Sequence, residues 1–130
     1  MSTVLLVDDE NSVRQALRKI LEHGGMTIVE ADSADSAMAV IRTGATLIDA
    51  VVSDVLMPGT SGLAFYDELI RLEPSLNGRV VFLSGAARDP AIHDPIERLG
   101  VPLLSKLDDL MLVLDAVRIA TLKPRQERSK

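Results

Sequence analysis

Residues 51–62 have the sequence Val51-Val52-Ser53-Asp54-Val55-Leu56-Met57-Pro58-Gly59-Thr60-Ser61-Gly62, an apolar run followed by an acidic residue and a turn. Its apolar start predicts a buried strand, and Asp54 stands where that strand ends and a turn begins. A second apolar run, from Thr3 to Val7, is followed in the same way by Asp8 and Asp9. Three carboxylates at the ends of neighbouring strands repel one another unless a cation joins them. The pattern therefore predicts a site for a hard metal ion.

The length and composition of the chain restrict its class. It has 130 residues, 47% of them apolar, which suits one compact domain. The absence of cysteine excludes disulfides and thiolate metal sites. The apolar run from Val4 to Val7 is too short for a signal peptide or a membrane span, so we expect a cytoplasmic protein with no membrane partner. A net charge of −5, one tyrosine, two phenylalanines and no tryptophan argue against direct nucleic-acid binding.

Short apolar runs alternate with amphipathic stretches, and this alternation predicts an α/β fold built from repeated strand–helix units. Strands are expected at five places: Thr3 to Val7, Thr27 to Ala31, Asp49 to Ser53, Arg79 to Leu83 and Pro102 to Ser105. Four of the helices are expected at Val13 to Leu21 with an end at Gly24-Gly25, from near Ser33 to Gly44, at Leu63 to Leu72, and from after Asp108 to Leu122.

The helix between the fourth and fifth strands is predicted to be short. Asp94-Pro95 would break a helix that ran from Asp89 to Leu99, unless Pro95 lay in its first turn. We therefore expect this helix at about Pro95 to Leu99.

The apolar patterns of the strands also predict their order. The first, third and fourth strands are continuously apolar, as expected when both faces are covered. The second strand alternates and the fifth begins with Pro102, so both are expected at the edges. With right-handed crossovers, these choices give a flavodoxin-like, doubly wound (βα)5 fold with a five-stranded parallel sheet in the order 2-1-3-4-5. Asp8, Asp9 and Asp54 then converge at the crevice between the first and third strands.

Side chains suited to phosphoryl chemistry follow four of the predicted strands. They are Asp8 and Asp9, Asp54, Ser84 and Lys106. A carboxylate can accept a phosphoryl group as an acyl phosphate, and Mg²⁺ held by carboxylates can neutralise the charge on its oxygens. The Lys106 ammonium can add a second positive charge, and the Ser84 hydroxyl can donate a hydrogen bond. Each residue alone is more often an ordinary surface or strand-end group, but agreement among four strand ends favours a site.

The chain resembles the receiver domains of two-component response regulators, from its start to about Leu122. The resemblance rests on the acidic pair Asp8-Asp9, the run D-V-L-M-P-G-T-S-G from Asp54 to Gly62, the run L-S-G from Leu83 to Gly85, and Lys106. It implies a receiver domain over residues 1–122, and the basic residues 123–130 are expected to be a tail or the start of a linker.

The resemblance implies that Asp54 receives a phosphoryl group from a histidine kinase or a histidine phosphotransfer protein, and that the domain then switches conformation. It further implies that Asp9, Asp54 and the backbone carbonyl of Leu56 bind Mg²⁺ directly, with Asp8 assisting through water. A domain of this kind is regulatory and is not a turnover enzyme.

Two positions depart from the pattern of the family. The family usually has a proline in a cis peptide after its lysine, whereas Leu107 follows Lys106 here. The position three residues before the lysine is usually aromatic, whereas it is Leu103 here. These departures lend some support to an alternative, a receiver-like docking module that acts without phosphorylation. The intact Asp54, Ser84 and Lys106 speak against it.

Two other functions suit this sequence less well. A flavin- or nucleotide-binding module would need glycines and backbone N–H groups after the first strand, where Asp8-Asp9-Glu10 would repel a phosphate. A hydrolase of the haloacid-dehalogenase type needs a second acidic residue two positions after Asp54, where Leu56 stands.

The predicted last helix carries two apolar stripes. Leu110, Val113, Leu114 and Val117 form the stripe expected to face the core. Leu112, Ala116 and Ile119 recur at helical spacing on the other side and are expected to be a partner surface, either for a symmetric homodimer, which is favoured, or for the kinase or an output protein. Scattered surface apolar residues are the alternative.

Overall fold

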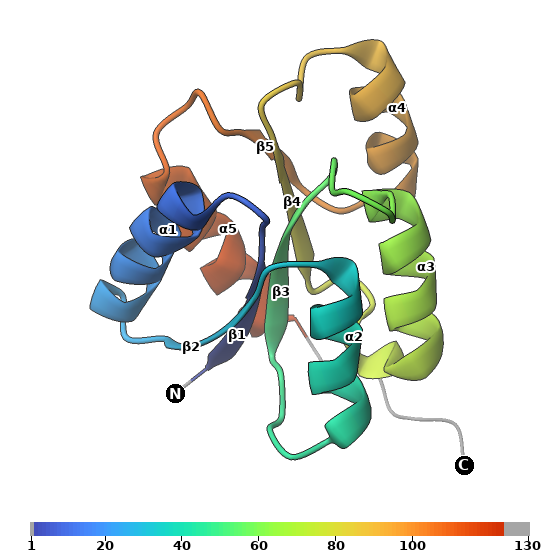
Figure 1. The fold of residues 1–130 in the computed structure, drawn as a ribbon. Helices are drawn as coiled ribbons and strands as arrows, with labels where there is room; N and C mark the ends of the chain where they lie inside the picture. The colour runs from blue at the N-terminus through green and yellow to red at the C-terminus, as the bar shows by residue number, and fades with distance from the viewer. Residues whose placement is uncertain (1, 124–130) are drawn as a thin grey trace.

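The computed structural model describes residues 2–123, which form a parallel five-stranded sheet between two layers of helices (Figure 1). The strands are β1 (Thr3–Val7), β2 (Thr27–Ala31), β3 (Ala50–Asp54), β4 (Val80–Ser84) and β5 (Leu103–Ser105). The helices are α1 (Asn11–His23), α2 (Ala34–Thr43), α3 (Gly62–Leu72), α4 (Pro90–Leu99) and α5 (Met111–Leu122), with a short 3-10 helix at Pro74–Leu76. The strand order β2-β1-β3-β4-β5 confirms the predicted fold class.

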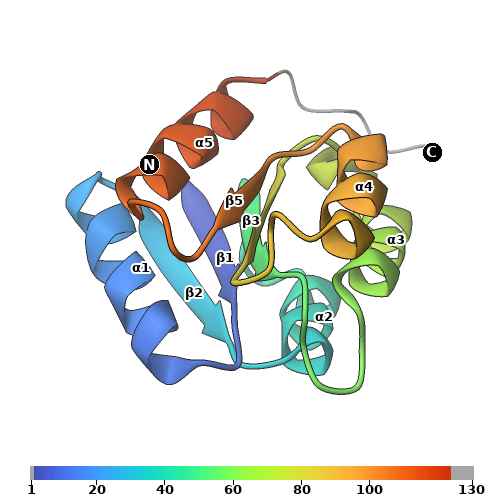
Figure 2. The ribbon, with the colours of Figure 1, turned by 90° about the horizontal axis from the view of Figure 1, so that it is seen from above.

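Two hydrophobic cores lie on the two faces of the sheet. Helices α1 and α5 cover one face, and helices α2, α3 and α4 cover the other (Figure 2). Successive residues of β1 contribute to different cores, Val4 and Leu6 to the first and Leu5 and Val7 to the second. Burial on both faces explains why β1, β3 and β4 have no polar alternation.

The edge strands are less buried, as their sequences predict. In β2, Thr27 is exposed and Glu30 is half-buried. All three residues of β5 are half-buried. Pro102 precedes β5 and contributes only its carbonyl oxygen, which accepts a hydrogen bond from Phe82 N at 2.9 Å.

The register of the sheet brings the carboxyl ends of the strands to one edge, the upper one in Figure 1. The last paired positions are Val7 with Ser53, Asp54 with Leu83, and Ser84 with Ser105. Strands β3 and β4 each begin and end one residue later than predicted. Asp54 and Ser84 are consequently the last residues of their strands, where the ladder of backbone hydrogen bonds fixes their position.

The prediction for α4 was wrong at its start. The helix begins at Pro90, and Asp89 caps it because its Oδ1 accepts a hydrogen bond from Ala91 N at 3.0 Å. Proline fits the first helical position, whose N–H has no partner inside a helix. Pro95 lies within the helix, where its missing N–H removes one hydrogen bond. Ile96 is fully buried against the core, and this packing holds the helix together around Pro95.

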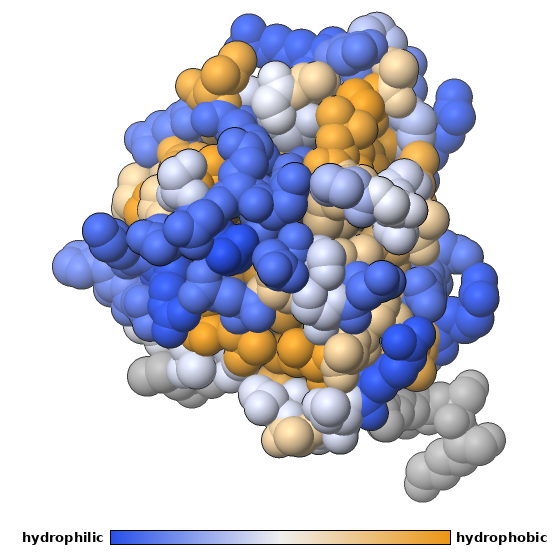
Figure 3. Space-filling model, viewed as in Figure 1, coloured by the Kyte–Doolittle hydropathy of each residue, from blue (hydrophilic) through white to orange (hydrophobic). Residues whose placement is uncertain are grey.

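Figure 3 shows hydrophilic residues over most of the face seen in Figure 1, with apolar residues confined to smaller patches. Among residues 2–123, none of the helices has the length and apolar character that crossing a bilayer requires.

Candidate functional site

An open cleft of about 340 Å³ lies at the carboxyl edge of the sheet. Its walls come from the ends of β3 and β4 and from the loops after β1, β3, β4 and β5, which Figure 2 shows from above. The lining residues are Asp9, Glu10, Asp54, Leu56, Ser84, Gly85, Ala86 and Lys106. The structure therefore brings together residues from the four strand ends that the sequence pointed to.

Asp54 forms the floor of this cleft. Its side chain is 6% exposed, and both carboxylate oxygens have partners. Oδ1 accepts a hydrogen bond from Leu56 N at 3.1 Å, and Oδ2 accepts one from Lys106 Nζ at 2.8 Å. The Ser53 hydroxyl donates to the carbonyl of Asp54 at 3.0 Å. These contacts hold the carboxylate in one orientation in the lining of the cleft.

Lys106 is the cation at the centre of the site. Its Nζ lies 2.7 Å from Glu10 Oε1, 2.8 Å from Asp54 Oδ2 and 3.1 Å from Asp8 Oδ2. Burial by itself would lower the pKa of Lys106, but its interactions with these three carboxylates outweigh burial and raise the pKa above its ordinary value. The ammonium is therefore charged at neutral pH.

Asp8 is buried beneath the cleft. Its Oδ1 accepts a hydrogen bond from Glu10 N at 2.8 Å. Its Oδ2 lies at ion-pair distance from Lys106 but receives no well-oriented hydrogen bond. Burial raises the pKa of the Asp8 carboxyl, and the contacts with Glu10 N and Lys106 offset this only in part.

The donor set fits a hard divalent cation. Carboxylate oxygens of Asp8, Asp9, Glu10 and Asp54 all lie within 4.8 Å of one another. Asp9 is exposed to solvent, so it can bind a cation that keeps part of its water shell. The buried Asp8 Oδ2, without a well-oriented donor, is a further acceptor for such a cation or its water. An all-oxygen set of this kind suits Mg²⁺.

The loop between β3 and α3 is closed tightly beside the cleft. Gly62 N donates to Val55 O at 2.8 Å, and Leu56 and Ser61 form an isolated antiparallel bridge. A Cβ on Gly62 would lie 2.8 Å from the Val55 Cα, so only glycine fits there. Ser61 caps α3 by accepting a hydrogen bond from Ala64 N at 3.2 Å. This closure holds the Leu56 backbone at the wall of the cleft.

Ser84 lies where the sequence predicted it. It is fully buried at the end of β4, and its hydroxyl accepts a hydrogen bond from Ala86 N at 3.0 Å. The Ser84 carbonyl accepts a hydrogen bond from Lys106 N at 3.0 Å, which ties β4 to the start of the last loop.

Sequence reasoning missed Glu10 as a member of the site. It follows the acidic pair directly, yet acidic residues in the first turn of a helix are common and gave no reason to single it out. The sequence feature that could have identified Glu10 is its position directly before α1. Ser, Thr, Asp or Asn usually stands there and caps the helix.

The two departures from the family pattern are accommodated locally. Residues 2–123 contain no cis peptide bond. The last loop turns instead through hydrogen bonds from Leu107 N to Ser105 Oγ at 3.1 Å and from Asp108 N to Ser105 O at 3.2 Å. Leu103 is half-buried and packs against the core.

The predicted partner surface on α5 is only partly exposed. Leu112 is 45% exposed and Ile119 is 62% exposed. Ala116 is half-buried and packs against the core between α1 and α5, so it lies at the margin of the stripe and not at its centre. Met111 and Leu122 are also exposed and enlarge the apolar surface of this helix.

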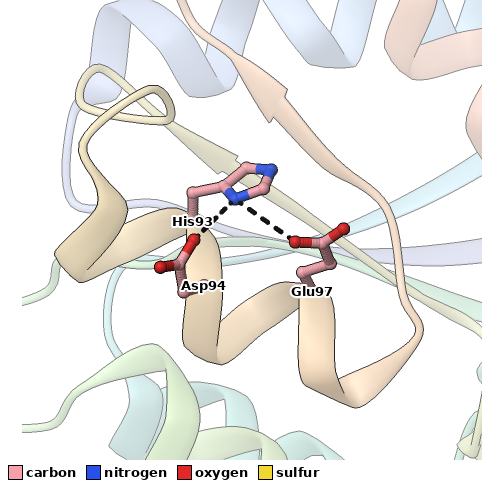
Figure 4. Close-up of side chains that lie close together, drawn as sticks. All are labelled: His93, Asp94 and Glu97. Carbon is pink, nitrogen blue, oxygen red and sulfur yellow. Dashed lines mark hydrogen bonds and ion pairs between the residues drawn. The ribbon is translucent and has the colours of Figure 1, made fainter.

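A separate group of polar side chains lies on α4. Figure 4 shows His93 between Asp94 and Glu97, with His93 Nδ1 3.1 Å from Asp94 Oδ1 and 3.6 Å from Glu97 Oε2. All three side chains are exposed on one helix and lie outside the cleft.

Comparison with known proteins agrees with the geometry. The family model described as "Response regulator receiver domain" matches residues 4–117. The sensor kinase CckA of Brucella abortus is 38% identical over 88 residues, which make up 68% of this chain and 9% of CckA. The C4-dicarboxylate transport transcriptional regulatory protein DctD of Rhizobium meliloti is 36% identical over 57% of this chain and 16% of its own length. Nodulation protein W of Bradyrhizobium diazoefficiens is 30% identical over 96% of this chain and 53% of its own length.

Solved structures show the same fold. The receiver domain from the hybrid histidine kinase CckA superposes with a TM-score of 0.74 and 26% identity, covering 92% of this chain and 99% of that one. A response regulator receiver domain protein from Clostridium thermocellum gives a TM-score of 0.78 and 25% identity, covering 94% and 95% of the two chains. The resemblance inferred from Asp8-Asp9, Asp54 and Lys106 is thus confirmed: this chain belongs to the response regulator receiver domain family of two-component signalling proteins.

Proposed function

We propose that the chain is a phosphorylation-controlled switch in which Asp54 accepts a phosphoryl group from a phosphohistidine of a histidine kinase or histidine phosphotransfer protein. The observation that carries the proposal is the Asp54 carboxylate, held at the floor of an acidic cleft 2.8 Å from the Lys106 ammonium. The cleft is open to solvent, so a donor histidine can approach it.

In the proposed transfer, a carboxylate oxygen of Asp54 forms a bond to phosphorus while the phosphorus–nitrogen bond of the donor breaks. The electron pair of that bond returns to the imidazole, which takes up a proton. The phosphoryl group carries negative charge on three oxygens, so the surroundings act mainly by positioning and charge neutralisation. Lys106 supplies a positive charge from one side, and the buried Ser84 can turn its hydroxyl toward a phosphoryl oxygen.

We further propose that Asp9, Asp54 and the Leu56 carbonyl hold Mg²⁺ directly and that Asp8 acts through water. A divalent cation there supplies the charge that lets clustered carboxylates and a phosphoryl group share one cleft. The oxygen atoms of the acidic cluster and the backbone of Leu56 at the cleft wall support this assignment.

The domain is proposed to act on its own phosphorylation and dephosphorylation only, as a regulatory unit in the cytoplasm and not as a turnover enzyme. The matched segment spans only 9% and 16% of the first two relatives, so the output of the whole protein is a separate question. The complete set of Asp54, Ser84 and Lys106 in one cleft favours phosphorylation over a docking role that dispenses with it.

Intact mass after incubation with acetyl phosphate and Mg²⁺ tests the proposal. The protein is expected to gain the mass of one phosphoryl group, and Asp54→Asn is expected to gain none. Asp67→Asn is a matched control, because Asp67 is exposed on α3 and pairs with Arg71, away from the cleft. A phosphoryl adduct that persists in Asp54→Asn would overturn the assignment.

A further inference from the structure

Glu10 occupies the N-cap position of α1 without capping the helix. Its backbone is extended, with φ −88° and ψ 107°, and its side chain makes no hydrogen bond to the first turn. A short polar side chain at this position usually accepts a hydrogen bond from that turn. The Glu10 carboxylate reaches away from α1 and accepts a hydrogen bond from Lys106 Nζ at 2.7 Å. The contact joins residues 96 positions apart in the sequence.

The backbone of Glu10 is fixed beside the cleft. Its N–H donates to Asp8 Oδ1 at 2.8 Å, and its carbonyl accepts from Arg14 N at 3.0 Å. Arg14 Nη1 also donates to the Asp8 carbonyl at 2.7 Å. The side chain of Glu10 therefore starts from a defined point next to Lys106.

Three carboxylates crowd the Lys106 ammonium. Its Nζ donates hydrogen bonds to Glu10 Oε1 and Asp54 Oδ2, and Asp8 Oδ2 lies 3.1 Å away as an ion-pair partner. A phosphoryl oxygen that approaches Lys106 therefore competes with these carboxylates for the ammonium. The side chains of Asp8 and Asp54 are 2% and 6% exposed, whereas that of Glu10 is 55% exposed. Only Glu10 can exchange the ammonium for water by a side-chain rotation, so it is the partner that leaves at least cost.

From these contacts we propose that Glu10 is a positioning residue that competes with a phosphoryl group on Asp54 for the Lys106 ammonium. It holds Lys106 when Asp54 is unmodified and must release it when the phosphoryl group binds. Glu10 therefore disfavours the phosphorylated state and shortens its life. This inference rests on the proposed function of Asp54.

Beryllofluoride, a mimic of the phosphoryl group, tests the competition at saturating Mg²⁺. Its affinity is measured from amide NMR shifts of the cleft residues Gly85 and Ala86. Glu10→Gln is expected to bind the mimic about three- to fivefold more tightly than the unaltered chain, the range of a partly exposed ion pair. Glu22→Gln removes the same charge from α1, away from Lys106, and is expected to leave the affinity unchanged.

Two further variants separate competition for Lys106 from simple charge repulsion. In a Lys106→Gln background, Glu10→Gln is expected to change nothing, because the contested ammonium is absent. Glu10→Asp keeps the charge but shortens the reach, and is expected to bind the mimic more tightly, as Glu10→Gln does. If the gain persists without Lys106, or if Glu10→Asp binds like the unaltered chain, repulsion is the cause and the inference is wrong.

The same titration distinguishes failure of this inference from failure of the proposed function. If the unaltered chain and Asp54→Asn respond alike to beryllofluoride, the role of Asp54 is wrong. If only the unaltered chain responds and Glu10→Gln has the same affinity, Asp54 keeps its role and the competition by Glu10 is refuted.

Discussion

Asp8 and Asp9 are adjacent in the sequence but differ in their surroundings. Asp8 is 1% exposed and is already engaged by Glu10 N and Lys106, whereas Asp9 faces solvent at the rim of the cleft. Asp9 is therefore better placed to bind a cation directly. Asp8 is better placed to contact the water molecules and ligands that surround the cation.

From this difference we expect Asp9→Ala to weaken Mg²⁺ binding more than Asp8→Ala. Loss of a residue that contacts these surrounding ligands costs about tenfold or more in metal affinity, and loss of a direct ligand costs more than that. Calorimetric titration of both variants with Mg²⁺ measures the difference. Equal losses would show that the roles within the pair are assigned wrongly.

Most of the site could be predicted from single residues, because Asp8, Asp9, Asp54, Ser84 and Lys106 each stand at or after the end of an apolar run. The contribution of Glu10 could not. An acidic residue before a helix can cap it, favour its dipole or point elsewhere, and only the folded loop decides among these.

At the scale of elements, Glu30 joins β2 to α1. It accepts hydrogen bonds from Arg14 Nε, at 3.0 Å, and from Arg18 Nη1. Partial burial by itself would raise the pKa of Glu30, but these hydrogen bonds outweigh it and hold the pKa below its ordinary value. The ion pairs therefore stabilise the fold above the ordinary carboxyl pKa, and this contribution disappears as pH falls through the lower folded-state pKa.

Glu30→Gln is accordingly expected to lower the free energy of unfolding by about 1 kcal/mol at neutral pH, because its side chain is partly exposed. The difference between the variant and the unaltered chain should vanish in acid. Denaturant unfolding followed over a pH series measures it. A difference that is constant with pH would show that packing, and not charge, accounts for the effect.

Helix α4 contains two prolines with opposite consequences. Pro95 lies in the second turn and removes a backbone hydrogen bond, so Pro95→Ala is expected to stabilise the domain by about 1 kcal/mol or more. Pro90 is the first helical residue, where proline fits, so Pro90→Ala is the matched control and should give no gain. Thermal and denaturant unfolding of the two variants provide the comparison. A gain from Pro90→Ala equal to that from Pro95→Ala would contradict this account.

The same helix shows where sequence reasoning about elements stops. The strand order followed from local features, such as the alternation in β2 and Pro102 before β5. The start of α4 depended on a conflict between the break expected at Asp94-Pro95 and the helix that the structure begins at Pro90. Burial of Ile96 against the core resolves that conflict, and tertiary packing of this kind cannot be inferred from a short stretch of sequence.

At the scale of the whole molecule, the apolar surface of α5 is the feature to test for self-association. Leu112, Ile119, Met111 and Leu122 are exposed on this helix, whereas Ala116, which the sequence predicts in the same stripe as Leu112 and Ile119, is half-buried against the core. We expect Leu112→Glu together with Ile119→Lys to lower the apparent mass in sedimentation without unfolding the domain. Leu47→Glu is the matched control, since Leu47 is 65% exposed and lies outside α5.

A protein that is monomeric at high concentration, both unmodified and with beryllofluoride, would refute the homodimer.

The sequence also predicts that the receiver domain ends at residue 122 and that a basic tail follows at 123–130. Helix α5 ends at Leu122, and the tail lies, from residue 124 on, outside the described residues.

The excess of carboxylates in the cleft has a kinetic consequence. The cleft holds a cluster of four carboxylates, three of them beside its one ammonium, so an anionic phosphodonor that diffuses toward Asp54 meets a repulsive potential. A divalent cation meets the opposite potential and is drawn in. For the proposed transfer to Asp54 we therefore expect ordered arrival, with the cation first and the donor second, so that the cation concentration would control how often an encounter with a donor is productive.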